Sequence, residues 1–159
     1  MKFNKAIKNL FIVLFSTLLI SACSTAKKAN VDTANDVYTG TDTVEFLAKG
    51  VPDRIFFATN KSKLTTASRD TLRKQATWMR KNKDVTVTVE GHADERGTRE
   101  YNLALGERRA NAAKDYLMTY GVSGKRISVI SYGKERPVNP ASSPFAWSQN
   151  RRSVTVKAN

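Results

Sequence analysis

The chain has 159 residues, of which 27 are Lys or Arg and 14 are Asp or Glu, so its formal net charge is +13 at pH 7. This length fits one domain of ordinary size with extensions, since domains commonly run to about 100–150 residues. The basic balance is compatible with nucleic acid, an anionic lipid or an acidic polymer as partner. With one histidine and one cysteine, the chain lacks the usual ligand set of a zinc site.

The first 22 residues have the features of a secretory signal. Lys2, Lys5 and Lys8 precede an apolar run at residues 10–20, and the small residues Ser21 and Ala22 follow it. A helix of that length rises only about 16 Å, whereas a bilayer core needs about 20 residues. The segment is therefore expected to direct export, and its removal leaves 24 basic and 14 acidic residues in the mature chain.

The only cysteine, Cys23, directly follows this segment. A lone thiol in an exported chain has no intramolecular disulfide partner. Residues 20–23, ISAC, resemble a bacterial lipobox, in which the cysteine receives a diacylglyceryl thioether and, after cleavage, an N-terminal acyl chain. Two or more chains anchor stably, because each buried CH2 contributes about 0.8 kcal/mol. Ser24, rather than Asp, follows the cysteine, and the resemblance implies an outer-membrane destination.

Residues 23–43 are predicted to be a flexible, lipid-anchored tether. They are rich in Ala, Thr, Asn and Asp and have no helical or strand period. Some 20 residues reach at most about 70 Å when fully extended at 3.3–3.6 Å each. An anchored domain on such a tether suggests a partner at a distance from the membrane.

The remaining residues, 44–159, are predicted to form one domain of alternating strands and helices. In chain order, the strands are expected at 55–57, 85–90, 127–132 and 153–157, and the helices at 66–81 and 97–120, with one helical turn near 145–149. In the last strand, Val154 and Val156 are expected to face inward. The predicted fold class is an α/β sandwich of order β-α-β-α-β-(α)-β, with one mixed sheet and the helices packed on one face.

The loop GHADERG, residues 91–97, and the helix after it carry the candidate site. Asn102 and Arg109 are seven residues apart, so they lie only about 20° from eclipsed, at the edge of the buried helix face. Asp94 follows the adjoining strand. An arginine binds a carboxylate bidentately and an aspartate binds an ammonium, so together they would suit a zwitterionic group. The alternative is that Asp94 bonds its own turn and Arg109 is a solvated helix charge.

The sequence gives little support for catalysis, metal binding or nucleic-acid binding. No paired carboxylates at catalytic spacing, nucleophile elbow or metal set is present. His92 with Asp94 is half a metal site at most, and such a histidine more often caps a strand end or touches solvent. The basic residues are not regularly interleaved with aromatics, so no stacking platform for single-stranded nucleic acid is predicted. We therefore expect that the protein is not an enzyme and that it carries no cofactor apart from the covalent lipid on Cys23.

A resemblance to a known family makes the binding site specific. The stretch VEGHADERGTREYNLALGERRANAAKDYL, with ISVISYGKERPV and the terminal NRRSV, is very similar to the OmpA-like peptidoglycan-binding domain over about residues 44–157. In that family the aspartate of the GHxD loop and the last arginine of the RR pair grip the amino acid end of diaminopimelate in the peptide stem. These residues are Asp94 and Arg109 here, while Asn102 belongs to the same motif and Leu105 lines the pocket one turn on.

Two parts of the chain depart from the family pattern. Thr59 and Asn60 stand where the family usually has Phe-Asp after its first strand, so they are candidate ligand contacts, and Asn60 brings no charge. The segment SSPFAWSQ, residues 142–149, also differs from the nearest members. Arg151 and Arg152 match the family's terminal pair and are interpreted as structural or surface residues.

The resemblance implies a lipoprotein of the outer membrane, anchored on its periplasmic side through Cys23, that binds peptidoglycan noncovalently. It further implies TolB and other Tol proteins as partners, with roles in envelope integrity and cell division, and no nucleic acid. Three alternatives remain: a cell-wall-anchoring lipoprotein of the same family outside the Tol system, a basic nucleic-acid-binding protein, and a cell-wall amidase.

Overall fold

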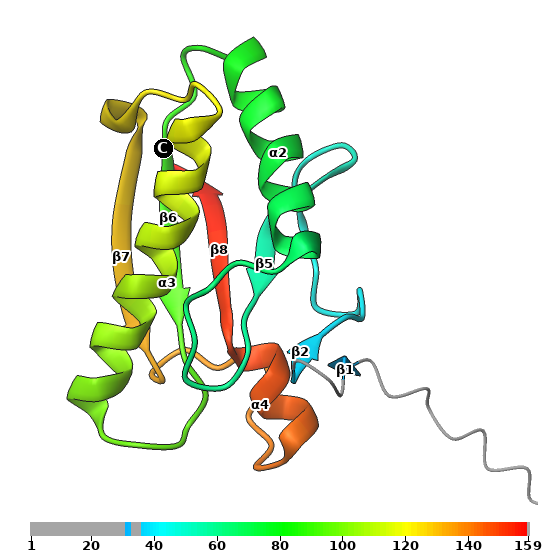
Figure 1. Ribbon diagram of the computed structural model, residues 1–159, viewed down its shortest axis with the longest axis vertical. Coiled ribbons are helices and arrows are strands. Elements are labelled where there is room, and N and C mark those ends of the chain that lie inside the picture. The colour runs from blue at the N-terminus through cyan, green and yellow to red at the C-terminus, as the bar shows by residue number, and fades with distance from the viewer. Residues whose placement is uncertain (1–30, 33–35, 159) are drawn as a thin grey trace, which may run out of the picture.

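The computed structural model describes residues 31–32 and 36–158 (Figure 1), so the predicted signal segment and Cys23 lie outside the described residues. A four-stranded sheet in the order β5-β8-β6-β7 forms the centre of the fold. Strands β6 and β7 are parallel, and β8 is antiparallel to both β5 and β6. Their bounds are Arg54–Phe56 for β5, Val87–His92 for β6, Ile127–Gly133 for β7 and Arg152–Lys157 for β8.

Two long helices, α2 (Thr66–Lys81) and α3 (Arg99–Thr119), cover one face of this sheet (Figure 1). The short helix α4 (Pro144–Asn150) lies at the end of the sheet where β6 finishes and β8 begins, and a single 3-10 turn, η1 (Gly124–Arg126), precedes β7. The predicted α/β sandwich with one mixed sheet and the strand and helix order β-α-β-α-β-(α)-β is confirmed. No helix in the described part of the chain is long and apolar enough to cross a bilayer.

The packing follows from the apolar stripes of the two helices. Thr65 and Thr98 cap α2 and α3 by accepting hydrogen bonds from the backbone N–H groups of Ser68 and Tyr101. Both helices then bury their apolar faces against the sheet. The core contains these buried residues: Ile55, Phe57, Leu72, Ala76, Met79, Val87, Val89, Ala110, Ala113, Leu117, Val122 and Ile127.

Helix α3 lies unusually close to β6 because two glycines meet there. A Cβ atom at Gly91 would lie 1.8 Å from the carbonyl oxygen of Gly106, so neither position has room for a side chain. This contact fixes the height of α3 above the end of β6. As a result, Arg109, one turn beyond Gly106, lies over the loop that follows the strand.

The prediction for the faces of β8 is wrong. Thr155 pairs with Val89 and Ser153 with Gly91, so these two polar residues share the helix-covered face. Thr155 is buried there and donates a hydrogen bond of 2.9 Å from its hydroxyl to Oε1 of the buried Gln75. Val154 therefore lies on the opposite face, where it is also buried. Because both faces of β8 are covered, the alternation of valine and polar residues does not identify the core side.

Part of the segment expected to be the tether, Val37 and Tyr38, packs on the domain. Val37 and Tyr38 are buried, and the ring of Tyr38 meets that of Phe56 edge-on at 4.7 Å between centroids. They form β2 (Val37–Tyr38), which pairs with β1 (Val31–Asp32); a second small hairpin follows, with β3 (Phe46–Ala48) and β4 (Val51–Pro52). Packing of the chain thus begins before residue 44.

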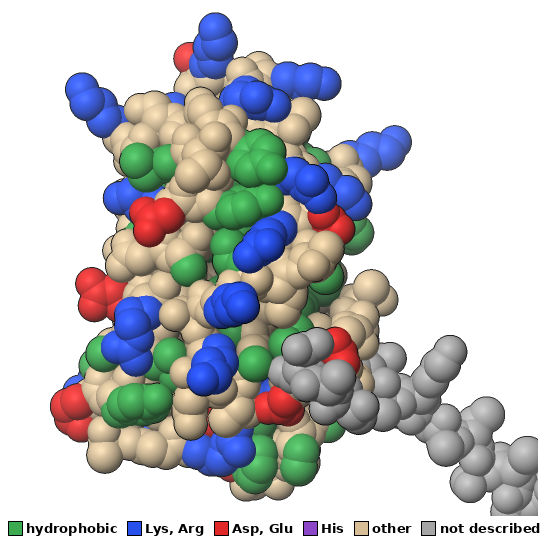
Figure 2. All heavy atoms as spheres, viewed as in Figure 1, with side chains coloured by type: hydrophobic (Ala, Val, Ile, Leu, Met, Phe, Trp, Pro, Cys, Tyr) green, Lys and Arg blue, Asp and Glu red, His purple; other side chains and the backbone are tan. Residues whose placement is uncertain are grey.

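Basic side chains dominate the surface on the side of α2 and α3. Figure 2 shows Lys and Arg spread over this face, with only a few acidic groups among them. The helical layer is therefore a predominantly basic surface.

Candidate functional site

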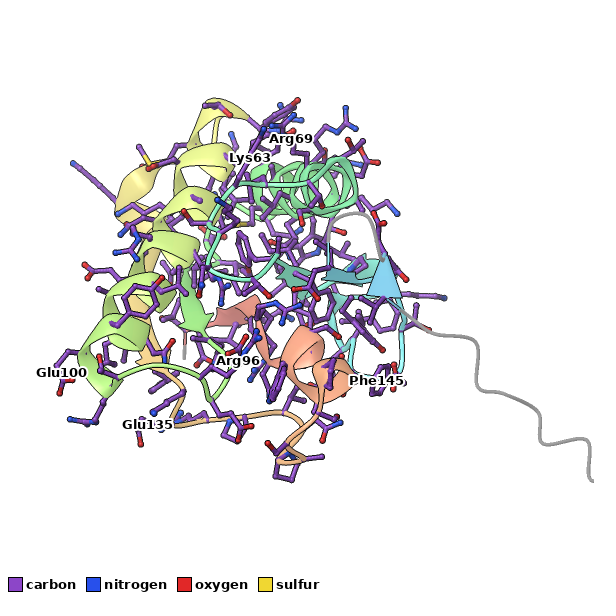
Figure 3. All side chains as sticks on the ribbon, turned by 60° about the horizontal axis from the view of Figure 1, so that its bottom comes forward. Lys63, Arg69, Arg96, Glu100, Glu135 and Phe145 are labelled. Carbon is purple, nitrogen blue, oxygen red and sulfur yellow. The ribbon has the colours of Figure 1, made fainter. Side chains whose placement is uncertain are left out.

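The candidate site lies at the carboxyl end of β6. Asp94 is two residues past this strand, and Arg109 reaches the same place from α3. The loop after β5 and the residue before β8, Arg151, complete it, since Arg109 and Arg151 both bond that loop. Figure 3 looks toward this end of the molecule, with Arg96 from the same loop near its centre. Residues far apart in the sequence are thus gathered around one carboxylate.

Arg109 is completely buried, so the alternative of a solvated helix charge is wrong. Its guanidinium donates to three backbone carbonyls: Nε to Lys61 at 2.9 Å, Nη1 to His92 at 2.7 Å and Nη2 to Ala58 at 3.1 Å. Burial and the nearby charge of Arg151 lower its pKa to about 9, so it remains cationic at neutral pH. One N–H on each terminal nitrogen has no hydrogen-bond partner within the described residues, and because the side chain is 0% exposed these groups are covered in this conformation.

The Asp94 carboxylate is occupied by arginines. Arg96 donates to it from its backbone N–H at 3.2 Å, from Nε at 3.0 Å and from Nη2 at 2.7 Å, while Arg151 Nη1 lies 3.3 Å away. Burial raises the pKa of the Asp94 carboxyl, but the hydrogen bonds and charge of Arg96 outweigh this and hold it below its ordinary value. Asp94 is therefore an ionised carboxylate with a cation already bound, and the side chain of that cation is 42% exposed.

Arg151 is the second buried cation of the site. Its Nε donates to the carbonyl of Phe57 at 3.0 Å, and its Nη2 lies 2.9 Å from Oδ1 of Asp36 while also bonding the Asp36 carbonyl. Of the two interpretations made for Arg151, a structural or a surface residue, the structural one holds, because the side chain is only 1% exposed and bonds Phe57 and Asp36. Arg152, 6% exposed, lies beyond it on the sheet face away from the helices. The sequence contained no signal that Arg151 would bridge Asp94 to Asp36.

Asn102 and Leu105 support the site from α3. Asn102 is 1% exposed and donates from Nδ2 to the carbonyl of Arg96 at 2.9 Å, so its amide holds the loop in place. Leu105 is buried one turn further along the helix. These contacts position the loop that carries Asp94, and contact of either residue with a ligand stays a prediction.

Thr59 and Asn60, the two candidate ligand contacts after the first strand, have different environments in the structure. Thr59 joins the site, since its hydroxyl accepts from Arg96 Nη2 at 3.2 Å and donates to the carboxylate of Asp36. Asn60 is exposed and has a positive φ of 54°, a conformation that asparagine adopts more readily than most residues. Thr59 is thus the better placed of the two for a ligand contact.

The departing segment SSPFAWSQ braces the site loop. It forms most of α4, and Trp147 donates from its indole N–H to Oε1 of Glu95 at 2.7 Å. The guanidinium of Arg96 lies over the ring of Trp147, 4.3 Å from its centroid. Sequence reasoning missed this contact, although an isolated tryptophan in a Ser- and Pro-rich segment was a signal for it.

His92 is buried and electrically neutral, so of the two alternatives, capping a strand end or touching solvent, the solvent contact is wrong; His92 is the last residue of β6. It is 1% exposed, and its Nε2 lies 3.5 Å from a carboxylate oxygen of Glu90. Burial, together with the charges of Arg152, Arg54 and Arg136, lowers its pKa to about 3. Within residues 31–32 and 36–158, no three His, Cys, Asp or Glu residues are grouped to hold a metal ion.

Lowering the pH from 7 to 5 is expected to cost about 2 kcal/mol of unfolding free energy through His92. In the unfolded chain the imidazole titrates near its ordinary pKa of about 6.5, whereas its pKa in the folded protein is about 3. The unfolded state therefore takes up the proton first, and stability falls as the pH drops below 6.5. The Asp94 carboxyl, whose pKa is lowered, also stabilises the folded protein, but this stabilisation is lost only when the pH falls below the ordinary range of a carboxyl group.

Urea unfolding of the wild-type domain at pH 7 and pH 5 measures this difference. In His92→Gln, which cannot titrate, the difference between the two pH values should largely vanish. An undiminished difference in that variant would assign the pH dependence to other groups.

Comparison with known proteins was made on sequence and on structure. Residues 56–151 match the model of the OmpA family. A Rhizobium meliloti protein named peptidoglycan-associated lipoprotein is 46% identical over 149 residues, which cover 91% of this chain and 85% of that protein. A Brucella suis protein of the same name is 45% identical over 150 residues, covering 91% of this chain and 89% of its own length.

Solved structures have the same fold. The crystal structure of the peptidoglycan-associated lipoprotein from Burkholderia pseudomallei matches with a TM-score of 0.65 and 32% identity, over 67% of this chain and 90% of that one. The C-terminal domain of Helicobacter pylori MotB matches with a TM-score of 0.63 over 67% of this chain and 84% of that one. Its identity is only 23%, so it supports the fold alone.

Proposed function

This chain belongs to the OmpA family, and from this membership we propose that it is a lipoprotein that binds peptidoglycan noncovalently through the peptide stem. The observation that carries the proposal is the meeting of Asp94 and Arg109 at one end of the sheet. There an ionised carboxylate and a buried guanidinium, two of whose N–H groups have no partner among the described residues, lie in the same site. The names of the similar proteins, peptidoglycan-associated lipoproteins, support the same ligand.

The ligand group is the free amino acid end of diaminopimelate in the stem. Its ammonium binds the carboxylate of Asp94, and its carboxylate accepts hydrogen bonds from the two remaining N–H groups of Arg109 once the side chains that cover this buried guanidinium have moved aside. The ammonium replaces Arg96, whose side chain is 42% exposed and can turn outward, away from Asp94 and from the ring of Trp147 that it now covers. One cation is exchanged for another at Asp94, so the carboxylate never stays buried without a partner.

In the cell this binding would link the outer membrane to the wall. Cys23 carries the lipid in the periplasmic leaflet of the outer membrane, the segment after it spans to the domain, and the domain holds peptidoglycan. The protein then acts in the Tol–Pal system, with TolB and other Tol proteins as partners in envelope integrity and cell division. No reaction is catalysed. A lipoprotein of the same family outside that system would use the same binding site. Failure of the protein to co-purify with TolB would favour this alternative.

Co-sedimentation of the mature domain with purified sacculi tests the binding. We expect the domain to pellet with sacculi, to release no stem peptides from them and to show no sacculus-independent affinity for DNA. Release of stem peptides would indicate an amidase. Steeply salt-dependent DNA binding without sacculus binding would indicate a nucleic-acid-binding protein.

The lipid anchor gives a separate prediction. Cells that express the full-length protein and are fed a palmitate analogue should incorporate it into the wild type and not into Cys23→Ala. Ser24→Ala, which keeps the cysteine, is the matched control and should be labelled normally. If Cys23→Ala is labelled as strongly as the wild type, Cys23 is not the acylated residue and the proposed lipid anchor is wrong.

A further inference from the structure

The loop between β5 and α2 has a second side, away from Asp94, that lines a groove of about 900 Å³. Three basic side chains line this groove, Lys61, Lys63 and Arg69, and we call it the basic groove. Thr59, Thr65 and Thr66 add hydroxyl groups to its wall. Figure 3 shows Lys63 and Arg69 close together where this loop meets α2. The groove thus offers cations and hydroxyl donors, the groups that bind oxyanions.

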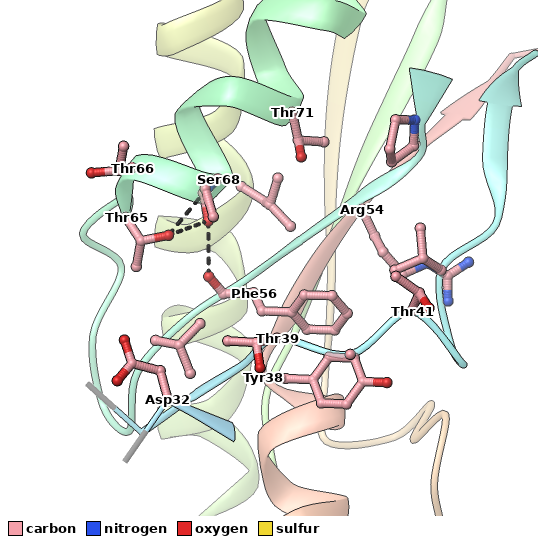
Figure 4. A pocket seen from close by; sticks show the side chains of 16 residues that line it. Asp32, Tyr38, Thr39, Thr41, Arg54, Phe56, Thr65, Thr66, Ser68 and Thr71 are labelled. Carbon is pink, nitrogen blue, oxygen red and sulfur yellow. Dashed lines mark hydrogen bonds between the residues drawn. The ribbon is translucent and has the colours of Figure 1, made fainter. Parts of the chain in front are cut away.

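The three cations are not neutralised by the protein. All three residues are exposed, and their side chains form no ion pair within the described residues. Asp36 is the one acid among the described residues of the groove wall, and its carboxylate is already engaged by Arg151 and Thr59. Asp32 lines the neighbouring cavity beside Tyr38, Phe56 and Ser68 (Figure 4). The groove therefore retains a positive potential.

Arg69 lies at a position where its charge does not stabilise α2. It lies in the first turns of α2, a helix with no acidic residue in its first turn, and the positive end of the helix dipole disfavours a cation there. Arg80 and Lys81, in contrast, lie in the last turn, where a cation is favourable. Stability of α2 thus explains the charges at its far end but not the charge at Arg69.

The basic groove adjoins the Asp94 site. Arg109 bonds the carbonyls of Ala58 and Lys61, so the same loop is held by the site on one side and lines the groove on the other. Thr59 contacts both, because it accepts from Arg96 and lines the groove. A peptide gripped at Asp94 and Arg109 can therefore continue along this loop into the groove.

We propose that the basic groove is a second binding site, which takes further carboxylates of the peptide stem held at Asp94 and Arg109. This inference rests on the proposed function. A concave groove continuous with the site fits a chain that leaves it, whereas a flat anionic membrane would meet exposed cations on a convex surface. Lys61, Lys63 and Arg69 add affinity that is electrostatic and depends on salt.

Two matched triple variants test the inference. Lys61→Gln/Lys63→Gln/Arg69→Gln removes the groove charges, and Arg80→Gln/Lys81→Gln/Lys83→Gln removes three exposed charges from the other end of α2. Arg80 is about 16 Å along the helix from Arg69 at 1.5 Å per residue, beyond the Debye length of about 14 Å at 0.05 M salt. Both variants have the same net charge, so they differ only in where the charge is lost.

Binding to sacculi is measured for the wild type and both variants at 0.05 M and 0.5 M salt. We expect the groove variant to bind about 5-fold or more weakly at 0.05 M, with less than about a 2-fold loss in the control variant. At 0.5 M salt the difference should nearly disappear.

Each other outcome overturns a distinct claim. If the wild type does not bind sacculi, the proposed function fails. If the wild type binds and both variants lose affinity equally, or neither does, the groove is not a binding site although the function stands. If only the groove variant loses binding to vesicles with 30% phosphatidylglycerol while its sacculus binding is unchanged, the groove serves a lipid surface instead.

Discussion

Asp94→Asn is expected to weaken binding of the mature domain to sacculi by about 30-fold or more. The substitution keeps the shape of the side chain and removes the charge that would hold the ammonium of the ligand. Losing one partner of a buried, hydrogen-bonded ion pair costs about 2–5 kcal/mol, and about 1.4 kcal/mol corresponds to a factor of ten. Sedimentation across a range of sacculus concentrations measures the loss.

Asp53→Asn is a suitable control for this effect. Asp53 is 6% exposed and Asp94 7% exposed, and Asp53 is also paired with an arginine, Arg54, at the end of β5 remote from the site. The control should lose stability in urea but keep its affinity for sacculi. If both variants lose affinity to the same degree, the effect belongs to the fold and not to the Asp94 carboxylate.

Arg109→Met is expected to lower the free energy of unfolding by about 3–5 kcal/mol. The change leaves the carbonyls of Ala58, Lys61 and His92 without their donors in a buried place. Each unsatisfied buried group costs about 1–3 kcal/mol, offset in part by the apolar methionine side chain. Urea unfolding followed by circular dichroism measures the difference.

Arg108→Met is the matched control, because Arg108 is the neighbouring arginine and is exposed. Its free energy of unfolding should change by less than about 0.5 kcal/mol. A loss below about 1 kcal/mol in Arg109→Met would contradict the idea that this guanidinium holds the loop. Arg109 therefore has two roles in this account, a structural one in the loop and a binding one toward the ligand.

The elements of the fold were largely predictable because their signals are local. The stripe of Leu72, Ala76 and Met79 predicted a helix over residues 66–81, and α2 has these bounds. A Pro-rich connection with one helical turn near 145–149 became α4, Pro144–Asn150. Helix periodicity and caps depend on residues three or four positions apart, so the sequence contains them directly.

The faces of β8 and the packing of Val37 and Tyr38 were not predictable from local pattern. Alternation of apolar and polar residues identifies the core side only when the other side is open to water, and β8 is covered on both. Val37 and Tyr38 are two apolar residues in a polar segment, and their burial depends on Phe56 in a strand reached later in the chain.

At the site, spacing made Asp94 and Arg109 compatible with a common ligand, and the family resemblance supplied the ligand. Neither indicated what holds the site together. Arg109 bonds carbonyl oxygens, which every residue has, so no side-chain motif marks its partners. Arg151, Asp36 and Trp147 reach Asp94 and its loop from segments far apart in the sequence.

Release of the bound domain by small competitors tests whether Asp94 and Arg109 bind a zwitterionic ligand end. The wild-type domain is first bound to sacculi and then treated with free diaminopimelate or with pimelate at equal concentration. Pimelate has both carboxylates and no ammonium group, so it cannot pair with Asp94. We expect diaminopimelate to release the domain and pimelate to leave it bound. Equal release by the two, or none by either, would contradict recognition of a zwitterionic end by Asp94 and Arg109.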